Sequence, residues 1–197
     1  MAVFGKGGAR RDYGAERARL WNESCEIYAT LIDGGSLPIE PTTLFVRDDE
    51  VVFLHDYDIG WRTVVSFTPD EIIMALGAER YYQRSAYAVQ EIRSVLHDEH
   101  WGVTSYLTDQ RLIIMSSRKN VSLWHSDLIA IHGNLDDAGA LLPDEFNLAY
   151  DGHRPYTLLG PTSLRLAISL AWAAGGANAL DNQVFAPVAA AVSTPRP

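Results

Sequence analysis

Short β-rich runs separated by tight turns occupy the second half of the chain, and one helix with a single apolar stripe follows them. The turns Thr108-Asp109-Gln110 and Asp151-Gly152 fall between such runs, and the second is a strong hairpin dipeptide. The pattern predicts an α+β fold, an antiparallel β-barrel or sandwich closed by a C-terminal helix. The expected strands are 103–107, 111–115, 121–124, 128–132, 145–150 and 156–159, and the helix starts at 161–163, buries Leu164, Ile168 and Trp172, and ends at Gly175-Gly176.

The first forty residues predict a basic arm, a helix and a stiff connector. Residues 1–12 are rich in glycine and arginine and have no apolar core, which indicates a flexible arm and no signal peptide. From Tyr13 onward, apolar residues recur every three or four positions, which is typical of an amphipathic helix. The glycines in Asp33-Gly34-Gly35 end this helix, and two prolines within 37–41 make the following connector extended.

Residues 41–100 carry a mixture of strand and helix signals. A hairpin is expected from 43–47 and 50–54, and a third strand at 61–67 follows a loop at 55–60. Thr68-Pro69-Asp70-Glu71 has the capping pattern of a helix start, and an apolar stripe predicts a further helix over 83–96. This segment is either an extension of the domain that follows or a second, degenerate copy of it. After Asp181 the chain is rich in Ala, Val and Pro, so residues 181–197 form an ordered strap or a loose tail.

Residues 101–114 and 121–129 combine a glycine, a strand, a Thr-x-x-Arg-Leu turn, a second strand, and a third strand that leads into a polar-acidic-apolar-Ile step. This arrangement resembles the bacterial pleckstrin-homology-like (PH-like) and GRAM-like domains. The resemblance implies a PH/GRAM-like domain at 101–180, on a scaffold that binds lipids, peptides or partner subunits and seldom catalyses a reaction. Within the motif, we expect Thr108 and Arg111 to fix the turn and to pair with neighbouring carboxylates.

The charge balance narrows the class of partner. The 197 residues carry a formal net charge of -9, which argues against a general nucleic-acid or anionic-lipid surface, because both need clustered Lys and Arg. The first 19 residues contain five basic and two acidic side chains, so they carry +3 and leave -12 for the rest. The arm, with Arg10 and Arg11, is thus either a solubilising tail or a segment that docks on an acidic surface.

Residue types that carry catalysis are present without the spacing that catalysis needs. Cys25, the single cysteine, lies on the apolar stripe of the first helix, where a thiol is buried and inert, and its isolation suits a reducing compartment. No Gly-x-Ser-x-Gly elbow and no phosphate-binding glycine loop occur. His97-Asp98-Glu99-His100 is the densest cluster of metal-ligating types, and we interpret it as the polar end of a helix. The sequence predicts no enzyme, no bound metal and no cofactor.

These observations favour a non-enzymatic, cytoplasmic interaction module of bacterial or phage type, which self-associates or docks a protein partner through exposed strand edges and its N-terminal helix. The alternative is a module that binds an acidic headgroup or a lipid at the barrel mouth or at the Arg118-Lys119 hairpin, and a weaker alternative is a small metal-dependent hydrolase that uses His97, Glu99 or His100. No membrane span is expected. Tryptophans at strand ends can leave one ring face exposed to a partner. The candidate partner- or ligand-binding residues are Trp61, Trp101, Trp124, Arg118, Lys119, Arg10 and Arg11.

Overall fold

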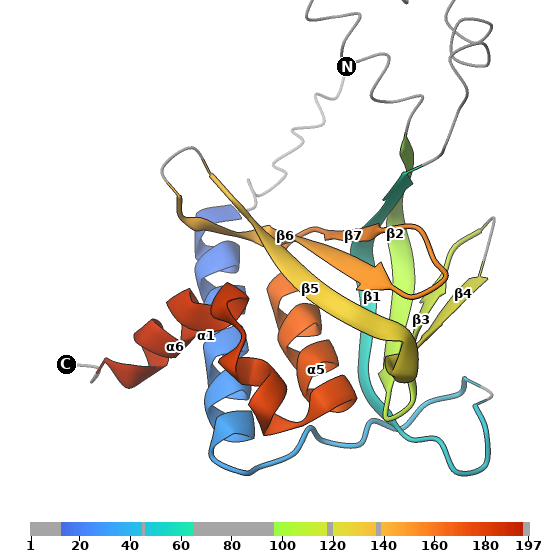
Figure 1. Cartoon of the computed structure of the whole chain (residues 1–197), viewed down its shortest axis with the longest axis horizontal. Helices are drawn as coiled ribbons and strands as arrows, with labels where there is room; N and C mark the ends of the chain where they lie inside the picture. The colour runs from blue at the N-terminus through green and yellow to red at the C-terminus, as the bar shows by residue number, and fades with distance from the viewer. Residues whose placement is uncertain (1–12, 45, 65–96, 118–119, 137–138, 195–197) are drawn as a thin grey trace, which may run out of the picture.

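A computed structural model describes residues 13–44, 46–64, 97–117, 120–136 and 139–194. Within these residues seven strands form one antiparallel sheet in the order β4-β3-β2-β1-β7-β6-β5 (Figure 1). The strands are β1 (Val52–Val64), β2 (His97–Thr108), β3 (Arg111–Met115), β4 (Asn120–Trp124), β5 (Leu128–Leu135), β6 (Leu141–Tyr150) and β7 (Tyr156–Leu159). The predicted bounds of β3 and β7 are confirmed to the residue, and the α+β class is confirmed with them.

The sheet is open. Its two ends are β4 and β5, which are consecutive in the chain and joined by the single 3₁₀ turn η1 (His125–Asp127), without pairing to each other. Of the expected barrel or sandwich closed by a C-terminal helix, the antiparallel sheet and the helix are present, and the sheet is open, with β4 and β5 as its edge strands. The turn η1 carries the chain directly from one edge strand to the other.

One helix covers the inner face of the sheet and supplies much of the core. Helix α5 (Ser163–Gly175) buries Leu164, Leu166, Ile168 and Leu170 in the same cluster as the inward-facing strand residues (Figure 1). It ends at Gly176, whose positive φ of 67° lets its backbone N–H reach the carbonyl oxygen of Trp172 at 2.7 Å. The expected closure of one face by this helix and its glycine stop are confirmed.

The first helix and the C-terminal segment pack on α5 from the other side. Helix α1 (Tyr13–Ile32) contacts α5, η2 (Ala177–Asp181) and α6 (Ala186–Ser193), and η3 (Gln183–Phe185) links the last two. Phe185 is fully buried near Tyr28 of α1, and the Tyr28 hydroxyl donates to the carbonyl oxygen of Leu180 at 3.3 Å. After Asp181 the described chain is ordered as η3 and α6, which bury Phe185 and Val188 and complete the core. Among the described helices, none combines the length and the apolar character that crossing a bilayer requires.

Strand β1 is longer and more central than the sequence suggested. It pairs with β2 on one side and with β7 on the other, so the described part of 41–100 belongs to the same sheet as the later strands. The predicted loop at 55–60 is wrong: these residues are strand, with register shifts between Asp56 and Ile59 and between Ile59 and Trp61. Aspartate and glycine are poor strand formers, and irregular pairing hides the alternation that marks a strand. The predicted strand at 43–47 is also wrong for its described residues, where only a turn is present, with the N–H of Glu50 donating to Arg47.

The β1–β2 hairpin extends to the edge of the described region. Val64 pairs directly with His97, so residues 65–96 connect two strand ends that are already neighbours. The interpretation of His97-Asp98-Glu99-His100 as a helix end is wrong, because all four residues lie in β2. The helices expected within 68–96 lie outside the described residues, as do 65–67 of the third predicted strand.

The burial of Phe185 yields a stability prediction. Replacing Phe185 with alanine removes a fully buried ring and leaves a cavity between η3 and α1, so we expect the free energy of unfolding to fall by about 3–5 kcal/mol. The matched control is Ile39→Ala, which truncates a side chain that is 68% exposed and should cost less than about 0.5 kcal/mol. Urea unfolding followed by circular dichroism measures both, and equal stability of the two variants would contradict the placement of the C-terminal segment in the core.

Candidate functional site

Four of the seven predicted binding residues lie outside the described part of the chain. Arg10 and Arg11 belong to residues 1–12, and Arg118 and Lys119 fall in the sequence between β3 and β4. Their roles stay predictions. The three tryptophans can be placed, and they fall in three different environments.

Trp61 lies in the core, so the expectation that one of its ring faces is exposed is wrong. Its side chain is only 4% exposed and stacks on Tyr156 of the neighbouring strand, with ring centroids 4.4 Å apart. Trp101 is 61% exposed, and one edge of its ring covers Gly60, where an added Cβ would come within 2.8 Å of it. Trp124 is half-buried at the end of edge strand β4. The error over Trp61 arose because β1 continues on both sides of a residue that the sequence placed at a strand end.

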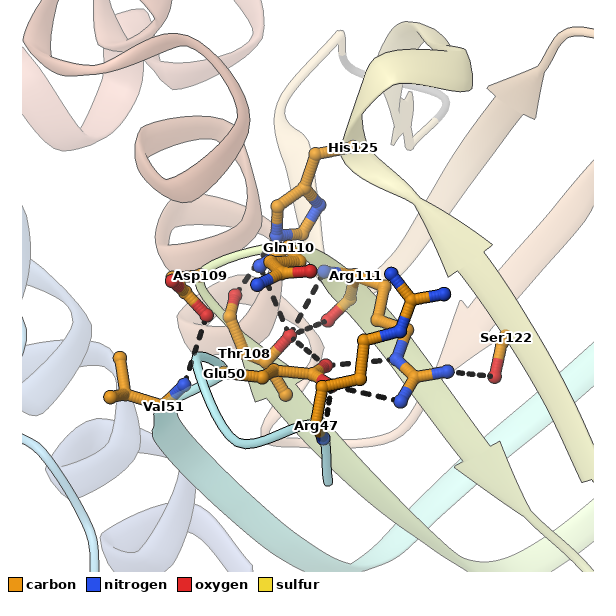
Figure 2. A network of polar contacts seen from close by, with 9 residues as sticks. All are labelled: Arg47, Glu50, Val51, Thr108, Asp109, Gln110, Arg111, Ser122 and His125. Carbon is orange, nitrogen blue, oxygen red and sulfur yellow. Dashed lines mark hydrogen bonds and ion pairs between the residues drawn. The ribbon is translucent and has the colours of Figure 1, made fainter.

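A polar network ties the β2–β3 turn to the segment that precedes β1 (Figure 2). Glu50 is buried and accepts hydrogen bonds from Arg111 Nε at 2.8 Å and Arg111 Nη2 at 2.9 Å, and from Thr108 Oγ1 at 2.8 Å. Thr108 Oγ1 in turn accepts from the backbone N–H groups of Gln110 at 3.1 Å and Arg111 at 2.9 Å. The prediction that Thr108 and Arg111 fix the turn and pair with a carboxylate is confirmed, and the carboxylate is Glu50.

The Glu50 carboxylate is held ionised by this network. Burial alone raises the pKa of Glu50, but the hydrogen bonds from Arg111, Thr108 and the backbone N–H of Arg47, with the charge of Arg111, outweigh it and lower the pKa below its usual value. A bidentate arginine-carboxylate pair of this kind fixes geometry as well as charge. Its first role is to hold the chain entering β1 against the β2–β3 turn.

Two guanidinium groups lie over the ring of Trp124. The Cζ atoms of Arg47 and Arg111 are 4.6 Å and 4.8 Å from its ring centroid, within the range of cation-π attraction. Arg111 is neutralised by Glu50, whereas in the described part of the chain no carboxylate forms an ion pair with Arg47. The arrangement leaves one cationic group on an aromatic platform near the β4 edge.

The opposite edge, β5, borders two hollows that sequence reasoning did not predict. The first, about 450 Å³, lies between β5 and the end of α5 with η2, and the second, about 590 Å³, lies between β5 and η3 with the start of α6. Ile131 and Asn182 line both hollows. The two hollows are together called the β5 groove.

Each hollow has an exposed aliphatic side chain at its rim. Ile129 lines the first and is 68% exposed, and Leu135 lines the second and is 62% exposed. At the second hollow η3 touches β5, because an added Cβ on Gly133 would lie 2.7 Å from Val184 Cγ2. The sequence showed an apolar run at 128–132, but it gave no sign that this run is an edge, since edge position depends on the order of all seven strands.

His125 lines the first hollow and is bonded to the end of β2. Its Nε2 donates to the carbonyl oxygen of Thr108 at 2.9 Å, so Nδ1 is the acceptor, and Nδ1 is buried without a hydrogen-bond partner. Burial lowers the pKa of His125, against the hydrogen bond to Thr108 and the charges of Asp109 and Glu50, which raise it. The imidazole is therefore neutral at neutral pH and offers a single acceptor.

The described residues hold no arrangement typical of metal binding or nucleophilic catalysis. No group of three or more His, Cys, Asp or Glu side chains lies together among them. Ser126 donates to Asp127, while His125 is bonded to the Thr108 backbone, so these neighbours form no relay. Cys25 is buried in α1, as predicted.

Comparisons with known proteins were made on the sequence and on the structure. No protein-family model and no curated protein matches the chain. Among solved structures, the Vps36 N-terminal PH domain is similar, with 73% of this chain and 91% of that chain covered, 15% identity and a TM-score of 0.38. With a TM-score this low, the likeness supports no inference about function. The architecture of the chain is an open antiparallel sheet with one face covered by helix α5. This is the coarse architecture that the resemblance to PH-like domains implies.

The Glu50 network makes a pH-dependent stability prediction. Glu50→Gln leaves the Arg111 guanidinium without its counter-charge, so we expect the free energy of unfolding at pH 7 to fall by about 1–3 kcal/mol. Because the folded pKa of Glu50 is lowered, the carboxylate stabilises the fold above the usual pKa of 4.5, and this contribution is lost as pH falls through the folded value.

Denaturant unfolding of wild type and Glu50→Gln across this pH range measures the difference. The gap should shrink as the pH falls below 4.5 and through the lowered pKa of Glu50, whereas the control Asp49→Asn, an exposed carboxylate in the same turn, should show little effect at either end. A gap that stays constant with pH would contradict the ionised pair.

Proposed function

We propose that this chain is a non-enzymatic protein-interaction module of PH-like type, whose β5 edge takes up an extended segment of a protein partner. The observation that carries the proposal is the combination of an unpaired strand edge with two apolar-rimmed hollows directly beside it. Unpaired main-chain groups of an edge strand give affinity for another extended chain, and hollows that receive alternate side chains give specificity.

The composition of β5 supports this role. Edge strands that avoid pairing carry lysine, proline or inward-pointing charges, and the β5 sequence Leu-Ile-Ala-Ile-His-Gly-Asn-Leu has none of these. Register shifts at each end of β5 leave Ala130–Gly133 as its regular part, a stretch of about 13 Å. A partner strand would pair over this short stretch and place side chains in the hollows on either side.

The proposal is tested by peptide selection on the intact chain. Random peptides displayed on phage and selected on the immobilised protein should yield extended binders that protect β5 amides from hydrogen exchange. Ile129→Lys should weaken their binding by at least about tenfold, because it places a charge on the rim of the first hollow. The matched control is Ile39→Lys, which adds the same charge at an equally exposed isoleucine in the connector after α1.

Binders that respond equally to both variants would overturn the proposal, and so would a selection with no binder. Light scattering at two salt concentrations identifies the source of the natural segment. A salt-insensitive dimer that Ile129→Lys dissociates makes the partner a second copy of this chain, and a monomer makes it a different protein.

The Arg47 guanidinium favours a second candidate function, the binding of an anionic ligand such as an acidic lipid headgroup. Arg47 lies on the Trp124 ring with no carboxylate partner in the described residues, near the β4 edge. The β4 strand begins directly after the turn that holds Arg118 and Lys119. An anion that meets these groups gains from charge and from the aromatic platform that orients Arg47.

Vesicle binding separates this candidate from the first. Sedimentation with vesicles that contain an anionic phospholipid should show binding that salt weakens, and that Arg47→Glu or Arg118→Glu reduces by about tenfold. Arg154→Glu, at the exposed β6–β7 turn, is the control for net charge. Equal binding to neutral vesicles, or an equal loss with the control, would count against a specific anion site.

A further inference from the structure

The surroundings of the β5 groove are acidic. Asp127 lies next to the start of β5, Asp181 lines the first hollow, and Asp136 follows the end of β5. Among the residues that the structure describes, no lysine or arginine lines either hollow. After residue 119 the sequence has seven acidic residues and three arginines, and one of these, Arg165, is paired with Asp56 at 2.9 Å. An extended segment that fits this groove would therefore be basic.

The chain itself contains such a segment. Residues 1–12 read Met-Ala-Val-Phe-Gly-Lys-Gly-Gly-Ala-Arg-Arg-Asp, with three basic side chains against one acidic side chain, and with Val3 and Phe4 as apolar residues. The apolar residues precede the basic ones, and glycines separate the two groups. The segment thus carries both kinds of side chain that suit the groove, apolar residues for its aliphatic rims at Ile129 and Leu135, and basic residues for the aspartates at its two ends.

The start of α1 lies within reach of β5. Arg17, in the first turns of α1, forms an ion pair with Asp144 of β6, and β6 is the strand paired with β5. Figure 1 shows the blue start of α1 beside the β5–β6 hairpin. Twelve extended residues span about 40 Å, whereas the eight residues of β5 span about 26 Å. The segment before Tyr13 is thus long enough to run along the whole of β5.

We propose that residues 1–12 occupy the β5 groove of their own chain and compete there with the partner segment. The inference rests on the proposed function, because it uses the same groove. Seven residue steps separate Phe4 from Arg11, and seven separate Leu128 from Leu135. With Arg10 and Arg11 beside Asp136, Phe4 falls at the first hollow beside Ile129.

The glycines of the segment stand where η3 packs on β5. In this alignment Gly7 and Gly8 lie beside Ile131 and His132, next to the point where Val184 packs on Gly133. A segment with bulky residues there would meet η3, whereas glycine lets a backbone approach closely. The segment would run parallel to β5, which gives slightly weaker pairing than an antiparallel strand. An antiparallel partner segment can therefore displace it.

The first test is competition with a synthetic peptide of residues 1–12 carrying a fluorophore. The full chain should bind it weakly, because its own arm is present at millimolar effective concentration. A full-length arm variant, with Phe4→Asp, Arg10→Glu and Arg11→Glu, should bind the peptide at least about tenfold more tightly. Adding Ile129→Lys to this variant should remove that binding, and adding Ile39→Lys should not. Circular dichroism checks that each variant is folded.

The second test is disulfide trapping in the full chain. Phe4→Cys with Ile129→Cys should form an intramolecular disulfide in the monomer, and Phe4→Cys with Ile39→Cys should not. A disulfide between two chains, with a mass that rises with concentration, would overturn occupation by the same chain.

Failure of this inference is distinguishable from failure of the proposed function. If the arm variant binds phage-selected peptides through Ile129 but does not bind the peptide of residues 1–12, the arm is not the occupant and the groove remains a docking site. If neither peptide class responds to Ile129→Lys, both the inference and the proposed function fail.

Discussion

Burial of α5 against the inner face of the sheet is the interaction on which the other features depend. Its aliphatic side chains fill the space between the strands, and its end sets the path of η2, η3 and α6. Because that path passes beside β5 and touches it at Gly133, the hollows exist only while α5 is seated. The same helix carries Arg165, which neutralises the buried Asp56 of β1, so packing and charge hold sheet and helix in one arrangement.

The Glu50 network performs a different task, at the β2–β3 turn. It joins residues 58 and 61 positions apart in the sequence, and it secures the entry to β1. The network affects the second candidate site indirectly. The Glu50 carboxylate neutralises the charge of Arg111, so of the two guanidinium groups over the Trp124 ring, Arg47 is the one whose charge is not paired with Glu50. The two candidate sites thus lie on the two opposite edges of one open sheet, and each edge has its own chemistry.

Local patterns in the sequence were enough to predict several elements. Regular alternation between strong turn residues placed β3 and β7, glycine stops placed the ends of α1 and α5, and the Thr108-Arg111 motif identified the turn and its need for a carboxylate. Strand order and contacts between residues far apart in the sequence could not be predicted from local patterns. Asp56 and Gly60 made part of β1 resemble a loop in the sequence. Because the predicted strand began only at Trp61, this residue was expected at a strand end with one ring face exposed. The β5 groove depends on the order of the strands and on a C-terminal segment that has no distinctive sequence pattern.

The direct pairing of Val64 with His97 has a consequence for how this fold can diversify. A tight turn would be enough to join two strand ends that already face each other, yet 32 residues intervene in this chain. Lengthening such a connection costs little, because each doubling of a loop adds only about 0.6 kcal/mol of closure entropy. The connection between Val64 and His97 is therefore a site where insertions or replacements of sequence can be tolerated while the sheet, its core and both edges stay unchanged.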